Sequence, residues 1–279
     1  MNWLSRQFTT RVIVLIPIAI ALNIVLGFIT QTVLRLPIYL DSIGTILVGV
    51  LAGPIAGAAT GAATNLIWQF TGITPNIGPF FVTAAVIGFL AGLWGYLGIF
   101  RPRPASGTQL VMAAAIAAGI VVLLVVPIIG NPTYLDPDLG GFPEWAVPAA
   151  IIIAILAALA VAAFIYVRRD LAGLWVALAG ALTGIVAAIV SAPIAAYVFG
   201  GVTGSGTDVI VAALRQGGAD VFQAALGQGF FSDPIDKVIT SFVVFVLLAG
   251  LSRRLVSRFP LGDRLGPTSE PMPGSSADN

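Results

Sequence analysis

The sequence contains no cysteine and no histidine, and only 9% of its residues are charged. Without these two residue types the chain has no disulfide framework, no thiolate or imidazole metal site and no imidazole base. Soluble domains carry roughly a quarter of their residues as charged side chains, so this composition excludes an ordinary soluble domain. The net charge of +1 offers no basic surface to a nucleic-acid partner, and none is expected.

Apolar residues make up 58% of the chain and gather in long runs. A helix satisfies its own backbone hydrogen bonds in lipid, so apolar runs of about 20 residues predict transmembrane helices. We therefore predict an all-α polytopic membrane protein whose second and third segments join in a tight hairpin at Gly53-Pro54. The eight hydrophobic segments are residues 11–34, 40–53, 54–73, 79–100, 108–129, 146–168, 172–199 and 233–252.

The basic residues predict the orientation of these segments. Arg6 and Arg11 precede a first run that is too long for the apolar core of a signal peptide and has no small-residue cleavage site after it, which favours a retained helix. With the N-terminus in the cytoplasm, ten basic residues fall inside and only Arg35, Arg215 and Lys237 fall outside. The positive-inside rule then predicts a multi-pass protein of the cell membrane with both termini cytoplasmic.

Two outer connections and the C-terminal segment differ in composition from the apolar spans. Residues 130–145 are acidic and rich in proline and glycine. Residues 200–232 contain two short apolar-periodic pieces separated at Gly217-Gly218, which predicts helices on the outer surface. After a membrane domain of residues 1–258, residues 259–279 have too little apolar content to fold and are predicted to be a disordered cytoplasmic tail.

The loop at residues 200–208, GGVTGSGTD, concentrates glycine with hydroxyl side chains. It lacks the GK[ST] ending of a nucleotide-binding loop and faces away from the cytosol in the predicted orientation, which excludes that function. Thr203, Ser205 and Asp208, with accessible glycine amides between them, are candidates to bind a small polar ligand. A flexible turn, with Asp208 as the cap of the following helix, is the alternative.

One helical face carries glycines and then amides. Gly53, Gly57 and Gly61 recur every four residues, a pattern that favours close helix packing. Asn65 and Gln69 continue this face, and an amide inside the membrane is costly without a partner. We take Asn65 as a candidate pocket residue.

Carboxylates stand at the predicted starts of two spans. Asp41 opens the second span, where it is either a helix N-cap or a pocket residue. The stretch FFSDPIDK opens the last span, with Ser232 or Asp233 as the expected cap and Asp233 able to pair with Lys237. Asp236 is not explained by capping, so Asp236 and Lys237 are pocket candidates.

Two aromatic residues, Trp68 and Tyr197, are candidates to stack on a ring of the ligand, with packing at the membrane interface as the alternative. A catalytic constellation is not found: a serine nucleophile lacks a histidine base, and only Lys237 is available for a serine–lysine pair. The sequence therefore predicts neither an enzyme nor a bound cofactor.

Three stretches resemble the S component of energy-coupling factor (ECF) transporters, the substrate-binding membrane subunit for vitamins and other micronutrients. They are LPIYLDSIGTILVGVLAGPIAGAATGAATNLI at 36–67, SAPIAAYVFGGVTGSGTD at 191–208 and SDPIDKVITSFVVFVLLAGLSRRL at 232–255. The resemblance implies a bacterial or archaeal cell membrane, a six-helix core and a substrate site under the outer loops, to which Asn76 belongs by position. It also implies three partners, a membrane T component and two cytoplasmic ATPases, which supply the energy while the S component topples to deliver its cargo.

The chain departs from this family in two places. Residues 108–168 read as an inserted transmembrane hairpin, which raises the count from six hydrophobic segments to eight. The family's first helix carries an AxxxA face that meets the T component, and the nearest counterpart here is Ala19, Asn23 and Gly27. Small-residue packing is kept, but the polar Asn23 is foreign to that pattern.

Two other functions stay open beside ATP-driven uptake. A ligand sensor or assembly scaffold can reuse the same binding fold without transport, and a solitary secondary transporter is the third possibility. Against the latter, no inverted repeat is visible, and the candidate ion sites Asp41 and Asp236 are predicted at helix ends. Outer carboxylates outnumber outer basic residues, which favours a neutral or cationic ligand such as a thiamine-like compound.

Overall fold

The computed structural model describes residues 3–34, 38–72, 76–129 and 146–266, which form helices and turns without a β-strand. The helices are α1 (Trp3–Gln7), α2 (Thr10–Gly27), η1 (Phe28–Val33), α3 (Ile43–Ala52), α4 (Pro54–Thr71), η2 (Gly78–Phe80), α5 (Phe81–Tyr96), α6 (Gly107–Ile129), α8 (Ala146–Arg168), α9 (Ala172–Pro193), η4 (Ile194–Val198), α10 (Asp208–Gln216), α11 (Val221–Gly250), α12 (Arg253–Val256) and η5 (Gly262–Leu265). The outer connection 130–145 lies outside the described residues.

Three of the described helical stretches are long and apolar enough to cross a membrane. They are Thr10–Val33, formed by α2 and η1, Gly78–Tyr96, formed by η2 and α5, and Ala172–Val198, formed by α9 and η4. The predicted helical class of the protein is thereby confirmed. The chain has the apolar helices of a membrane protein, while the full set of eight spans remains a prediction.

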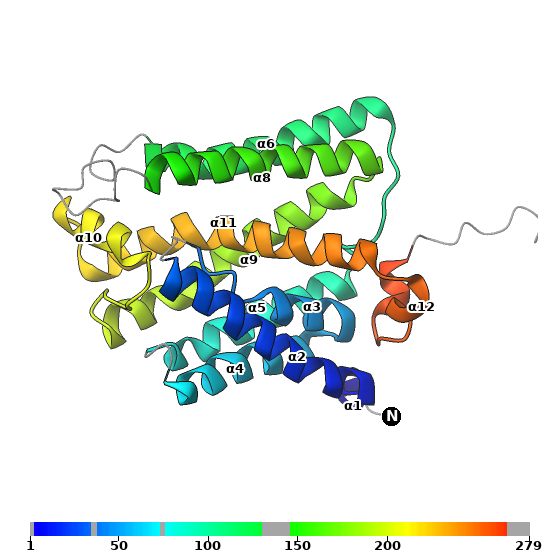
Figure 1. Cartoon of the computed structure of the whole chain (residues 1–279), viewed down its shortest axis with the longest axis horizontal. Coiled ribbons are helices and arrows are strands. Elements are labelled where there is room, and N and C mark those ends of the chain that lie inside the picture. The colour runs from blue at the N-terminus through cyan, green and yellow to red at the C-terminus, as the bar shows by residue number, and fades with distance from the viewer. Residues whose placement is uncertain (1–2, 35–37, 73–75, 130–145, 267–279) are drawn as a thin grey trace, which may run out of the picture.

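The helices pack along one another in a bundle (Figure 1). The α11 helix lies against α9, α4 lies against α5, and α6 and α8 pair with each other along one side. Aromatic rings join this α6–α8 pair to α11: Phe164 contacts both Phe242 and Phe245 edge-on, with ring centroids 5.3 and 5.4 Å apart. The helices predicted as a hairpin thus pack against one side of the bundle, through buried residues such as Leu110, Ala113 and Ile165.

Most of the arginine-bearing segments meet at one end of the bundle, which we call the arginine end. Arg11 at the start of α2 donates to the carbonyl of Arg258, and Arg264 donates to the carbonyl of Tyr96. In Figure 1, α1 and α12 lie at this end and α10 lies at the other. The grouping agrees with the predicted orientation, in which these arginines share one side of the membrane.

The first part of the predicted disordered tail is ordered. The Leu261 amide donates to the Leu51 carbonyl at the end of α3, Gly262 is buried, and the Arg264 guanidinium lies 4.0 Å from the centroid of the Tyr96 ring. The prediction of a disordered tail was therefore wrong for residues 259–266. Residues 267–279 lie outside the described residues. Backbone hydrogen bonds and a cation–π contact hold residues 259–266 in place, and the low apolar content of this segment gives no sign of such contacts.

The last long helix begins well before the predicted position. Asp220 caps α11 in a capping box with Gln223, and the helix continues through Pro234 to Gly250. The predicted cap at Ser232 or Asp233 was therefore wrong, because both side chains are buried in the middle of the helix. The break at Gly217-Gly218 is confirmed, since α10 ends at Gln216 and α11 starts at Val221.

The glycine face of α4 packs backbone against backbone. A Cβ placed on Gly57 would lie 2.2 Å from the Gly88 carbonyl oxygen of α5, and one on Gly61 would lie 2.1 Å from the Ala84 carbonyl oxygen. Neither backbone oxygen can move without separating the two helices. Small residues at this seam are therefore required for the close approach of α4 and α5.

Replacing Gly57 with alanine is expected to lower the free energy of unfolding by about 1–3 kcal/mol, because the added methyl overpacks the α4–α5 seam. Denaturant unfolding in detergent micelles measures the change. Gly72 provides the control in the same helix pair, since a Cβ there meets no atom within 4 Å. Its positive φ of 67° disfavours alanine, so the control substitution is asparagine. A Gly57→Ala variant as stable as the parent would contradict this packing.

The face predicted to meet a partner is turned inward. Asn23 is fully buried and Ala19 is 2% exposed, while a Cβ on Gly27 would lie 2.4 Å from the Trp68 ring. Asn23 accepts a hydrogen bond from the Gly44 amide at 2.7 Å and thereby serves the first turn of α3. Ala19, Asn23 and Gly27 are consequently packing residues of the chain, and their assignment to a partner interface was wrong.

Candidate functional site

A cavity opens at the end of the bundle opposite the arginine end. Its volume, counted as the space that the centre of a water molecule can reach, is about 110 Å³. At roughly 10–15 Å³ per water, this holds on the order of eight water molecules or one small organic molecule. The lining residues are Gln31, Thr32, Tyr39, Asp41, Ser42, Thr45, Asn65, Asn76, Ile77, Phe80, Thr83, Ala84, Ile87, Ala187, Ser191, Ala195, Thr203, Gly204, Ser205, Gln228, Asp233 and Lys237.

Segments far apart in the sequence build this wall. It combines the π-helical η1 and the segment 38–42, the inner faces of α4 and α5, the end of α9, the loop 199–207 and the middle of α11. Six of the ten predicted substrate-binding residues line the cavity. They are Asp41, Asn65, Asn76, Thr203, Ser205 and Lys237.

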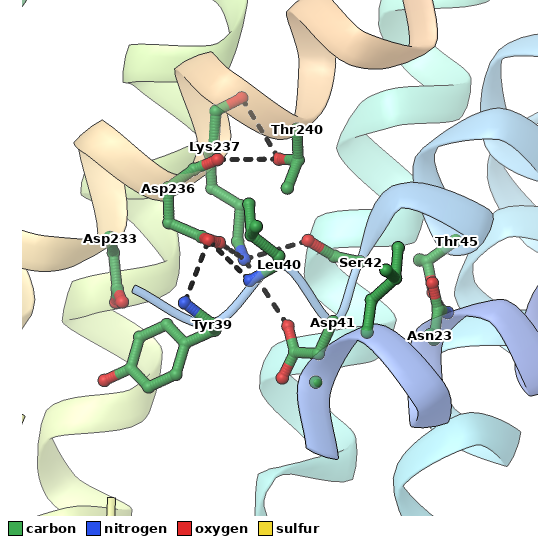
Figure 2. Close-up of polar contacts among 12 residues, drawn as sticks. Asn23, Tyr39, Leu40, Asp41, Ser42, Thr45, Asp233, Asp236, Lys237 and Thr240 are labelled. Atoms are coloured by element: carbon green, nitrogen blue, oxygen red, sulfur yellow. Dashed lines mark hydrogen bonds and ion pairs between the residues drawn. The ribbon is translucent and has the colours of Figure 1, made fainter. Parts of the chain in front are cut away.

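Asp236 and Lys237 form the ionic centre of the wall (Figure 2). Both are buried, and their side chains make an ion pair, with the Lys237 ammonium also donating to Ser42 Oγ at 2.9 Å. Asp236 Oδ1 accepts from the backbone amides of Tyr39 at 3.0 Å and Leu40 at 2.7 Å. Asp236 therefore positions the wall from behind and does not line the cavity itself, contrary to its predicted role.

These two hydrogen bonds hold a strained backbone. Leu40 has a φ of 51°, in the left-handed region that costs a non-glycine residue about 1–2 kcal/mol. Because Asp236 binds the amides of Tyr39 and Leu40 together, it fixes the direction in which the segment 38–42 enters α3. The position of the loop thus depends on a charge in α11.

Asp41 faces the cavity and does not cap α3. Its Oδ2 accepts from Gln31 Nε2 at 3.1 Å, and its Oδ1 lies 3.9 Å from the Lys237 ammonium. The cap position of α3 is Ser42, which makes no side-chain capping bond.

The glycine loop is tied together by Asp208. This carboxylate accepts from the Thr203 amide at 3.0 Å, the Thr203 hydroxyl at 2.8 Å and the Gly204 amide at 2.7 Å. Asp208 therefore bonds backward into its own loop; the cap position of α10 is Thr207, without a side-chain bond. It shapes the cavity wall without lining it.

A chain of hydroxyl groups joins the glycine loop to the segment 38–42. Ser205 Oγ lies 2.6 Å from Thr207 Oγ1, and Thr207 Oγ1 lies 3.1 Å from the Tyr39 hydroxyl. Gln228 Nε2 of α11 donates to the same Tyr39 hydroxyl at 3.1 Å. Tyr39 is thus the point at which two loops and a helix meet over the cavity.

Replacing Tyr39 with phenylalanine is expected to cost about 1 kcal/mol and to loosen both loops, because the contacts of its hydroxyl with Thr207 and Gln228 are lost. Hydrogen exchange should speed up at the amides of 38–42 and 199–207 and stay unchanged in α6. Tyr166→Phe is the matched control, since that side chain is 60% exposed on α8. Equal exchange in the parent and Tyr39→Phe would show that the hydroxyl does not join the loops.

The two aromatic candidates lie away from the cavity. Trp68 is fully buried against Gly27. Tyr197 is 77% exposed and stacks on Phe222, with ring centroids 5.9 Å apart. Neither ring lines the cavity, and in the structure both make packing contacts.

Gln31, Tyr39 and Gln228 line the cavity and were not predicted. Gln228 had a signal in α11, because it shares one helical face with Ser232 and Asp236, spaced four apart. A predicted break at Ser232–Asp233 hid this polar stripe. Tyr39 and Gln31 had no comparable signal, because only the tertiary fold brings them to the cavity.

No family model, curated protein or solved structure matches this chain. What the site does is therefore argued from its geometry and chemistry.

Proposed function

We propose that this chain is the substrate-binding subunit of an ECF-type transporter, which captures a small water-soluble vitamin or micronutrient for ATP-driven uptake. The observation that carries the proposal is a polar, partly enclosed cavity at one end of a helical bundle, opposite the arginine end. With the arginines cytoplasmic, the cavity faces the outside, where a nutrient is captured.

The proposal places the protein in a bacterial or archaeal cell membrane as a polytopic subunit. Its fold would be a six-helix S-component-like core, to which α6 and α8 add a hairpin, with both termini cytoplasmic. The exposed apolar side chains on α6 and α8, such as Met112, Ile152 and Leu156, suit contact with lipid. The energy would come from a membrane T component and two cytoplasmic ATPases.

The burial of Ala19, Asn23 and Gly27 changes where the T component would dock. The exposed side of the same helix carries larger apolar residues, among them Ile13, Val14 and Ile18. Contact through this side replaces the small-residue seam of the family. The proposal therefore requires a T component adapted to this chain.

A solitary secondary transporter is the second candidate, because the ionisable residues do not lie at helix ends. Asp233, Asp236 and Lys237 are buried in the middle of the 30-residue helix α11. Buried ionisable groups inside a long helix are typical of ion-coupled carriers. The third alternative, a sensor or scaffold that binds ligand without transport, has no comparable observation in its favour.

Reconstitution of the purified chain into proteoliposomes separates these functions. With a low-molecular-weight extract of the growth medium as the source of solutes, the chain alone should bind a solute but not accumulate it. Accumulation should require the co-purified ATPases and ATP. Accumulation by the chain alone under a proton or sodium gradient would overturn the ATP-driven function and establish the solitary carrier.

A further inference from the structure

The charges that face the cavity are unbalanced. The charged lining residues are two carboxylates, Asp41 and Asp233, and one ammonium, Lys237. The ammonium pairs most closely with Asp236 behind the wall and also lies 3.9 Å from Asp41, so one positive charge is shared among three carboxylates. The lining of the cavity therefore carries more carboxylates than ammonium groups.

Each of these carboxylates has spare capacity to accept hydrogen bonds. An ionised carboxylate offers about four acceptor sites. Asp41 receives one hydrogen bond from Gln31 and lies 3.9 Å from the Lys237 ammonium. Asp233 is 6% exposed, and the hydrogen bond described for it is a long one of 3.5 Å from Ser191. Removing such groups from water is costly unless an opposite charge reaches them.

A separate observation points to a ligand in the cavity. Thr83 of α5 lines the cavity, its side chain is more than nine-tenths buried, and its hydroxyl oxygen has no hydrogen-bond partner among the described residues. Buried hydroxyls are ordinarily paired, because an unpaired one costs free energy. A ligand in the cavity would supply the missing partner.

Two aromatic rings line the same space. Tyr39 and Phe80 are lining residues, and Phe80 is held by stacking on Phe199 with ring centroids 5.5 Å apart. The face of an aromatic ring attracts a cation, more strongly when both are removed from water. In Figure 2 the Tyr39 ring lies below Asp233, with Asp41 to its right. Carboxylates and ring faces are together suited to an organic cation.

We propose that the cavity selects a small organic cation, whose charge faces Asp41 and Asp233 and whose polar group pairs with the Thr83 hydroxyl. The inference rests on the proposed function only in taking the cavity as the substrate site. A quaternary ammonium or a charged aromatic ring both satisfy this chemistry. An anionic vitamin does not, because it would add a third negative charge to the space.

The test compares ligands of one shape and different charge. Choline, its neutral isostere in which a tert-butyl group replaces the trimethylammonium group, and the anion tert-butylacetate are titrated into the full chain in nanodiscs, with thiamine as a larger cation. Ligand-dependent rise of the thermal midpoint reports binding. The cations should raise the midpoint, and the neutral and anionic compounds should not. Stabilisation by the neutral or anionic compound as strong as that by the cations overturns the inference, and so does a lack of response to both cations.

Two variants test whether the lining carboxylates bind the cation. Asp233→Asn and Asp41→Asn should each weaken cation binding by roughly tenfold to a hundredfold, because each removes one charge-assisted contact. Asp263→Asn at the arginine end is the matched control and should bind as the parent does. Unchanged cation affinity in both cavity variants overturns the inference.

Thr83→Val gives a readout that does not depend on the charges. Because its hydroxyl has no partner among the described residues, the thermal midpoint without ligand should not fall, while cation affinity should fall roughly fivefold or more. A lower midpoint without ligand, with unchanged affinity, would show that this hydroxyl stabilises the fold and does not bind the ligand.

The two proposals fail separately. Cation binding without associated ATPases would overturn the proposed function alone. ATPase association with preference for an anion would overturn this inference alone.

Discussion

Replacing Asp236 with asparagine is expected to lower the free energy of unfolding by about 3–5 kcal/mol, because it leaves the buried Lys237 ammonium without its closest counter-charge. The side chains of both residues are at most 3% exposed, so bulk solvent does not replace the lost partner. Asparagine can still accept from the amides of Tyr39 and Leu40, so the change reports chiefly on the charge. Denaturant unfolding in detergent micelles measures it.

A second variant isolates the ion pair. The double substitution Asp236→Asn with Lys237→Met should recover part of the lost stability, because both charges are then removed together. Asp263→Asn, on the exposed surface, should change the free energy of unfolding by less than about 0.5 kcal/mol. If Asp236→Asn alone stays within about 1 kcal/mol of the parent, the pair does not organise the wall as described.

Replacing Asn23 with alanine is expected to cost about 3 kcal/mol, because one buried backbone donor and two hydroxyl groups lose their partner. The Asn23 amide nitrogen donates to Thr45 Oγ1 at 2.8 Å and to Thr64 Oγ1 at 3.2 Å, so this one side chain links α2 to both α3 and α4. Its oxygen accepts from the Gly44 amide in the first turn of α3. Thermal unfolding in micelles should show a clearly lower midpoint.

The comparison for Asn23 is an exposed amide in a helix. Gln216→Ala, at the end of α10, should leave the midpoint unchanged within error, since that side chain is exposed. If Asn23→Ala matches this control and gains affinity for a membrane partner instead, the inward orientation of α2 would be wrong. The three residues Ala19, Asn23 and Gly27 would then return to an interface role.

The sequence predicted best what depends on local chemistry. Long apolar runs gave the positions of α2, α5 and α9, and the glycines at 53, 57 and 61 indicated the close packing of α4. Thr203 and Ser205 of the polar loop at 200–208 line the cavity. In each case one segment carries its own signal.

The misses come from contacts between distant segments. Gln7 of α1 accepts from the Ile55 and Ala56 amides at the start of α4, and Asn23 does the same for α3. Because side chains of other helices accept from these first-turn amides, Asp41 does not cap α3 and instead faces the cavity. No pattern within residues 40–53 can show that their cap lies about twenty residues earlier in the chain.

The continuous α11 also differs from the prediction. Ser232–Asp233 followed by Pro234 is a common start signal for a helix. The capping box at Asp220 starts the helix earlier, and Pro234 lies inside it at a point where α9 packs closely: a Cβ on Gly184 would lie 2.4 Å from the Pro234 Cα. The charged residues are thereby moved from a helix end to the centre of the bundle.

A mild-detergent pull-down of the tagged chain from its native membranes, with identification of every co-purifying protein, tests the central claim most directly. The account predicts recovery of a multi-span T-like subunit together with two ATPases, which would make identification of the cationic ligand the next step. Recovery of the intact chain without an ATPase, in detergents that preserve comparable complexes, would contradict ATP-driven uptake and leave a solitary carrier or a sensor.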